Sequence, residues 1–131
     1  MPDALPLYAG WIGLALLSLV FLANALGIVD PSRAVRELAG AGLPGWLVPR
    51  AATLVGGGRL LQLAAAPALF FDATRPFAAL ALAGFLVPAT LTAHAFWRAK
   101  ADERSLQLAN FLKNLALIGG LVLAAGWRSP T

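Results

Sequence analysis

Residues 94–120, HAFWRAKADERSLQLANFLKNLALIGG, decide the fold, because they hold the end of one apolar stretch, a short charged turn and the start of the next. A short connection makes successive helices antiparallel neighbours, so this segment predicts a helical hairpin. It also carries His94, Asn110, Lys113 and Asn114 within apolar surroundings. Such groups are costly inside a membrane and usually face a partner or a water-filled cavity. We therefore expect any function to lie near this hairpin.

The rest of the chain continues the apolar pattern. Four apolar stretches occur, at about 7–28, 51–71, 76–97 and 106–127, and each has the roughly 20 residues that a helix needs to cross a membrane. Hydrophobic residues make up 60% of the chain and charged residues 12%, against about 25% charged in an average soluble domain. The sequence predicts one all-α domain over residues 1–131, a transmembrane up-down four-helix bundle.

The longest connection, residues 29–50, contains a further short helix. The sequence DPS at 30–32 is a helix-start pattern, and the helix is expected to run to about residue 39. Its two sides differ in polarity, which suits a helix lying on the headgroup surface; a plain ordered loop is the alternative. The apolar side consists of Val35, Leu38 and Ala39, and the polar side of Arg33, Arg36 and Glu37.

The basic residues near the stretch ends predict an orientation. Six basic residues fall in or beside the first and third connections: Arg33, Arg36, Arg50, Arg98, Lys100 and Arg104. Two fall on the opposite side: Arg75 and Arg128. Lys and Arg are in excess in cytoplasmic loops. Loops 29–50 and 98–105 are therefore expected in the cytoplasm and both termini outside.

The composition excludes several kinds of chemistry. The chain has no cysteine, so it forms no disulfide, thiolate metal site or iron–sulfur cluster. A single histidine cannot supply a multi-histidine metal site, so no metal is expected. The net charge of +4 is explained by anionic lipid headgroups, and no nucleic-acid partner is expected. The GGGR run at 56–59 lacks the ending of a phosphate loop and indicates close helix packing.

The polar side chains of the apolar stretches gather towards the predicted cytoplasmic half. In a hairpin turning near residue 101, His94 is expected level with Asn110, and Thr90 level with Lys113. Polar side chains of the first two stretches lie at the same level. Together with those of the hairpin they predict a polar pocket that opens to the cytoplasm and has Asn24 at its border. The candidate ligand-binding residues are Arg59, Gln62, Thr90, His94, Trp97, Asn110, Lys113 and Asn114.

The predicted pocket is cationic, because Arg59 and Lys113 have no acidic residue within the apolar stretches. A quinone headgroup suits such a pocket, since it offers two carbonyl acceptors and an apolar tail. His94 is the best candidate for a catalytic, proton-exchanging group, because the ordinary pKa of histidine is about 6.5. The alternative is structural: His94 bonds Asn110, Arg59 extends to the headgroups, and Lys113 and Asn114 join helices.

Two motifs carry a family resemblance: HAFW at 94–97 and NFLKNLALIGG at 110–120. With these motifs the chain resembles the DoxX family of small bacterial four-helix membrane proteins over most of its length. The resemblance implies a place in the bacterial inner membrane and a role in membrane redox biology. Related proteins form part of a thiosulfate:quinone oxidoreductase or act in oxidative-stress defence. The chain departs from the family at Trp11 and Ile28, where relatives often have Arg and Lys, and in its second stretch, which lacks their acidic residue.

Three functions follow as hypotheses. The first is a quinone-linked or redox-stress accessory subunit with a bound quinone and no covalent cofactor. The second is a noncatalytic membrane anchor of a larger complex, and the third, weaker one is a small carrier or proton pathway. The sequence does not distinguish an enzyme from a noncatalytic subunit. The expected partners are the lipid bilayer, an oxidoreductase or larger membrane complex, and a second copy of the chain.

Overall fold

The structure, a computed structural model, describes residues 4–27 and 31–130, so the predicted helix start at Asp30 and the family departure at Ile28 lie outside it. The described residues contain only helices and connections, which confirms the all-helical prediction. The elements are α1 (Ala4–Ala25), α2 (Pro31–Ala39), η1 (Val48–Arg50), α3 (Ala51–Ala68), α4 (Arg75–Ala93), η2 (Phe96–Arg98) and α5 (Arg104–Gly126).

Three helical segments of the described chain are long and apolar enough to cross a membrane: α1, α4 together with η2, and α5. These segments indicate a membrane protein. The remaining long helix, α3, has 18 residues and carries Arg59 and Gln62, and it is not among the three. A crossing by α3, and with it a bundle of four transmembrane helices, therefore stays a prediction.

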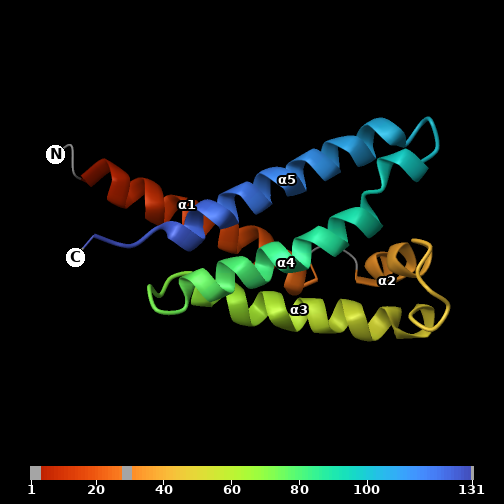
Figure 1. The fold of residues 1–131 in the computed structure, drawn as a ribbon, viewed down its shortest axis with the longest axis horizontal. Coiled ribbons are helices and arrows are strands. Elements are labelled where there is room, and N and C mark those ends of the chain that lie inside the picture. Colours follow the sequence, from red (N-terminus) through yellow and green to blue (C-terminus); the bar gives the residue numbers. More distant parts are fainter. Residues whose placement is uncertain (1–3, 28–30, 131) are drawn as a thin grey trace.

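The four long helices alternate in direction along the chain (Figure 1). The most extensive packing joins α4 to α5, and α1 packs chiefly on α3, while α3 also contacts α4. The short helix α2 packs against α3 and α4, near the end of the molecule at which α3 begins (Figure 1). A helix thus occurs where the sequence predicts one, and its place on a membrane surface stays a prediction.

Local sequence accounts for the helix ends in the hairpin. Pro76 lies in the first turn of α4, where its missing N–H costs nothing. The helix ends at Ala93, four residues before the predicted end, because His94 leaves the helical conformation (φ −122°, ψ 41°). Residues 96–98 then form the separate turn η2. His94 therefore lies at the end of α4 rather than within it.

Small residues bring the helices close together, as the sequence predicts for the GGGR run. A Cβ atom added at Gly58 would lie 2.5 Å from the Phe85 ring, so α3 and α4 meet closely at this glycine. A Cβ at Gly10 would lie 2.1 Å from the Trp127 ring, where α1 meets the end of α5. Neither position accepts a larger side chain without movement of the aromatic ring.

A buried arginine joins the α3–α4 turn to the C-terminal segment. The side chain of Arg75 is fully buried; it donates to the Leu69 carbonyl at 2.7 Å and the Trp127 carbonyl at 3.2 Å, and forms an ion pair with Asp72. Its guanidinium carbon lies 4.8 Å from the Trp127 ring and 5.6 Å from the Trp11 ring, within cation–π range. We call Trp11, Asp72, Arg75, Trp127 and Ser129 the arginine clasp.

Replacing Arg75 by Gln is expected to lower the free energy of unfolding by about 2 kcal/mol, because it removes the hydrogen bonds from a fully buried guanidinium to the Leu69 and Trp127 carbonyls. The measurement is thermal or denaturant unfolding in mild detergent, followed by tryptophan fluorescence, which reports on Trp11 and Trp127. Arg128→Gln is the control, because Arg128 is exposed. Equal stability of the two variants would contradict a structural role for the clasp.

The clasp also predicts an acid dependence of stability. Hydrogen bonds from Ser129, and then the hydrogen bond and charge of Arg75, lower the pKa of Asp72 to about 2 from 3.8. Ionised Asp72 therefore contributes stability above the unfolded pKa, and this contribution is lost as the pH falls from about 4 to about 2. The melting temperature of Asp72→Asn should fall less across this window than that of the parent protein. Parallel curves would count against the prediction.

Candidate functional site

The polar residues of α1 and α3 bond to one another. The Asn24 side-chain amide donates to Gln62 Oε1 at 2.8 Å, and Gln62 Nε2 donates to the Gly58 carbonyl at 3.0 Å. Ser18 Oγ donates to the Ala66 carbonyl at 2.9 Å. Gln62, one of the predicted ligand-binding residues, is thus buried between α1 and α3 with both ends of its amide bonded.

Arg59, which has no acidic residue within the apolar stretches, bonds a carbonyl of its own chain. Its Nε and Nη2 donate to the Ala25 oxygen at 3.0 and 2.8 Å. This oxygen ends α1, where the helix dipole places partial negative charge. Gly27 adopts φ +78° next to it, and a Cβ there would lie 3.2 Å from Arg59 Nη2. Two N–H groups of the guanidinium are therefore bonded within the chain, without a ligand.

A second group of polar residues joins α4 to α5. Asn114 Nδ2 donates to Thr90 Oγ1 at 3.0 Å, and both side chains are buried. His94 Nδ1 lies 2.9 Å from Gln107 Oε1. Because an amide oxygen only accepts, Nδ1 carries the hydrogen of this bond. The predicted register is close for Thr90, which meets Asn114, one residue beyond Lys113, whereas His94 meets Gln107, about one helical turn before Asn110.

Helix geometry explains which residues of α5 meet α4. Gln107 and Asn114 are seven residues apart and lie on one face of the helix, whereas Asn110 and Lys113 lie on the neighbouring face. Lys113 Nζ donates to Asn110 Oδ1 at 3.3 Å in an exposed position. Trp97 is half-exposed and packs edge-on against Phe111 at 5.9 Å between ring centroids. The predicted cluster is therefore divided among several faces rather than joined in one pocket.

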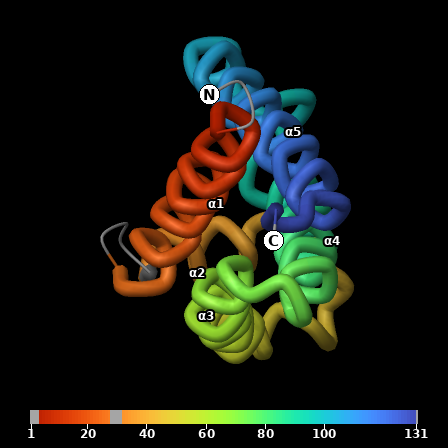
Figure 2. The backbone as a smooth tube through the Cα atoms, turned by 90° about the vertical axis from the view of Figure 1, so that its left-hand side faces the viewer, coloured from red at the N-terminus to blue at the C-terminus, as the bar shows by residue number. Residues whose placement is uncertain are grey.

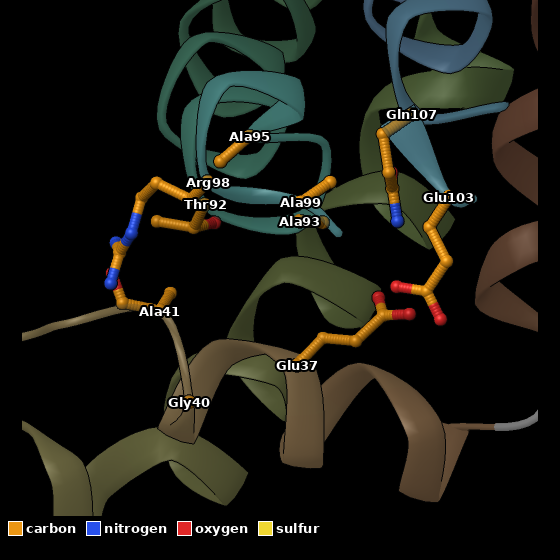
Figure 3. A pocket seen from close by; sticks show the side chains of 10 residues that line it. All are labelled: Glu37, Gly40, Ala41, Thr92, Ala93, Ala95, Arg98, Ala99, Glu103 and Gln107. Atoms are coloured by element: carbon orange, nitrogen blue, oxygen red, sulfur yellow. The ribbon is translucent and has the colours of Figure 1, made fainter. Parts of the chain in front are cut away.

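A cavity of about 230 Å³ lies between α2 and the turn end of the α4–α5 hairpin (Figure 3). We call it the hairpin cavity. Figure 3 shows the carboxylates of Glu37 and Glu103 and the amide of Gln107 directed towards one another on one side of it. The residues that line it are Glu37, Gly40, Ala41, Thr92, Ala93, Ala95, Arg98, Ala99, Glu103 and Gln107.

Arg98 fixes the opposite side of the hairpin cavity. Its Nη1 donates to the Ala41 carbonyl, joining η2 to the segment after α2. Gly42 has φ +77°, and a Cβ at this position would lie 2.7 Å from Arg98 Nη2. Glycine at this turn thus permits the arginine to reach the backbone. The contact holds α2 over the hairpin and so closes one wall of the cavity.

The side chains that line the hairpin cavity were not predicted from the sequence. None of the eight predicted ligand-binding residues lines it, although His94 touches it through Gln107. The spacing of Gln107 from Asn114 was the available signal, because it places both on the face that meets α4. For Glu37 and Arg98 there was no such signal, since their meeting depends on how α2 folds back. No three His, Asp or Glu side chains within the described ranges could hold a metal ion.

If the buried Thr90–Asn114 bond holds the hairpin together, a double-mutant cycle will detect it. Thr90→Val and Asn114→Leu, singly and together, should give a coupling energy of about 1 kcal/mol in detergent unfolding. Thr92→Val with Asn114→Leu is the control cycle and should give none, because Thr92 bonds the Pro88 carbonyl of its own helix at 2.8 Å. Equal coupling in both cycles would contradict a specific bond.

Comparison with known proteins adds no relative: no family model, no curated protein and no solved structure matches the chain. The DoxX resemblance therefore stays a prediction that depends on the HAFW and NFLKNLALIGG motifs. The structure places both motifs in the α4–α5 hairpin, HAFW at the end of α4 with η2 and the other within α5.

Proposed function

We propose that this protein is a DoxX-like, four-span protein of the bacterial inner membrane that serves as a quinone-linked accessory subunit. The hydrogen bond between His94 and Gln107, at 2.9 Å on the wall of the hairpin cavity, carries the proposal. It connects the only histidine of the chain to a cavity at the end of two apolar helices. A headgroup entering this cavity would keep its tail among those helices.

The residues of the cavity suit a quinone headgroup. Gln107 Oε1 is occupied by His94, so the amide N–H groups are the donors that remain for a ligand carbonyl. Glu37 and Glu103 supply acceptors for the two protons that a quinol releases on oxidation. The two electrons of the quinol pass to the redox centre of a partner oxidoreductase, because this chain has no cysteine or cofactor motif. In this proposal His94 is a positioning residue that acts through Gln107.

The size of the cavity favours a small headgroup. Its volume of about 230 Å³ lies below the roughly 300–1,000 Å³ of pockets that enclose drug-sized ligands. The charge distribution supports the proposed orientation, with loops 29–50 and 98–105 in the cytoplasm. The hairpin cavity would then open to the cytoplasm.

Gln107→Leu should weaken binding of a short-chain quinone about tenfold, because a hydrogen bond of about 1.4 kcal/mol is lost. The measurement is a titration of the purified protein with a water-soluble quinone, by calorimetry or by quenching of tryptophan fluorescence. Asn110→Leu, the same change one turn further along α5, is the matched control and should leave the affinity unchanged. The proposal fails if the parent protein does not bind quinone or if both variants bind equally well.

A second candidate function, a noncatalytic membrane anchor, is favoured by the way the polar groups of the helices pair with one another. Ser18, Gln62 and Asn114 all bond within the bundle, so none of them is held ready for a ligand. An anchor requires no ligand in the hairpin cavity. The quinone titration therefore distinguishes the two functions.

A further inference from the structure

The short helix α2 forms one wall of the hairpin cavity and is packed less deeply than the long helices. Figure 1 shows α2 as a separate helix at the end of the molecule where the α4–α5 hairpin turns, and in Figure 2 it lies next to α3. Every residue from 32 to 39 is exposed or half-buried, whereas α4 buries residues along its length. Segments with few buried contacts open at the lowest free energy. Of the walls of the cavity, α2 is therefore the one that moves at least cost.

The arginines of α2 bond to residues of the same helix. Arg33 Nε donates to Glu37 Oε1 at 2.9 Å, and Arg36 Nη1 donates to Ser32 Oγ at 3.1 Å. These bonds support the helix but do not attach it to its neighbours. Because isolated helices shorter than about 12 residues are not stable in water, the 9-residue α2 depends on its packing against α3 and α4. Its position is sensitive to the segment that follows it.

This segment contains a flexible connection and a contact that restrains it. Residues 40–45, GAGLPG, lead from α2 towards η1 and are rich in glycine, which allows wide rotation of the backbone. The Ala41 carbonyl accepts a hydrogen bond from Arg98 Nη1 of η2. Gly42 has φ +77°, and a Cβ there would lie 2.7 Å from Arg98 Nη2. Arg98 thus fixes the end of α2 at which the backbone turns most easily.

A contact between like charges opposes this restraint. Figure 3 shows the carboxylate of Glu37 on α2 directed towards that of Glu103, which immediately precedes α5. Two carboxylates that face each other repel, and the repulsion favours withdrawal of α2 from the hairpin. Arg33 reduces the repulsion by pairing with Glu37. The closed position of α2 therefore depends on Arg98, or on a ligand that donates hydrogen bonds to both carboxylates.

We propose that α2 is a lid on the hairpin cavity, held closed by the bond from Arg98 to Ala41 and opening by rotation about residues 40–45. A headgroup enters while α2 is withdrawn and is covered when α2 returns. A quinol has two hydroxyl donors, so it would bridge Glu37 and Glu103 and favour closure. This inference rests on the proposed function for the identity of the ligand, but the movement itself is measured without any ligand.

The role of Arg98 is tested by double electron–electron resonance between spin labels at Arg36→Cys on α2 and Leu106→Cys on α5. Both positions are exposed, and the parent chain has no cysteine. In mild detergent without quinone we expect one dominant distance and a second, longer one. Arg98→Gln should raise the ratio of the longer to the shorter distance about fivefold, the value of a hydrogen bond of roughly 1 kcal/mol. Lys100→Gln removes the same charge two residues later and should leave the ratio unchanged.

The flexible connection and the like-charge contact have variants of their own. Gly42→Ala places a Cβ against Arg98 and should raise the ratio as Arg98→Gln does, whereas a Cβ in Gly45→Ala meets no atom within 4 Å and should not. Glu103→Gln should lower the ratio about twofold, because it removes the repulsion of Glu37. Distances that stay unchanged in Arg98→Gln and Gly42→Ala, or that shift equally in Lys100→Gln, would overturn the lid. Failed quinone binding would overturn the proposed function alone.

Discussion

The arrangement of the helices depends on the need of every polar side chain for a partner within the protein, because hydrocarbon offers none. Asn24 meets Gln62, Ser18 meets the Ala66 carbonyl, and Thr90 meets Asn114. Apolar contacts alone tolerate sliding and rotation of one helix on another, since lipid tails are as apolar as leucine. The hydrogen bonds do not tolerate such sliding or rotation, because each bond requires its two atoms to lie at one distance. They therefore fix α1 on α3 and α4 on α5 in a single register.

The cations of the long helices also need partners within the protein, and a charged group is more costly to remove from water than a neutral polar one. Arg75 is enclosed by Asp72, two carbonyls and two tryptophan rings, which bond its Nε and Nη1 and, among the described residues, leave the buried Nη2 with ring contacts alone. Arg59 uses the negative end of α1, so its charge also secures the helix that supplies it. Both arginines present several N–H groups in a fixed plane, which suits carbonyl oxygens that cannot move. Lysine has a flexible stem and a compact charge, and Lys113 is the cation left at the surface of a helix.

The sequence predicts features that depend on neighbouring residues better than features that depend on residues far apart in the chain. Helices are predicted well, because apolar length and proline position act locally: α5 begins two residues before its predicted start and ends one residue before its predicted end. The hairpin partners were predicted less well, since the turn of Phe96–Arg98 shifts His94 to Gln107. The arginine clasp was missed, because Ser129 and Asp72 meet only after every helix has packed. The hairpin cavity was missed for the same reason.

The two ends of α5 lie in different surroundings. Near its start, the hairpin cavity carries the carboxylates of Glu37 and Glu103 together with the guanidinium of Arg98, so its charge is mixed and it suits a neutral headgroup that gives up protons. Towards its end, from Leu117 to Trp127, α5 lines an apolar groove with α1, and this lining contains no charged side chain. A polar headgroup therefore finds side-chain partners at the start of α5 and none along the groove.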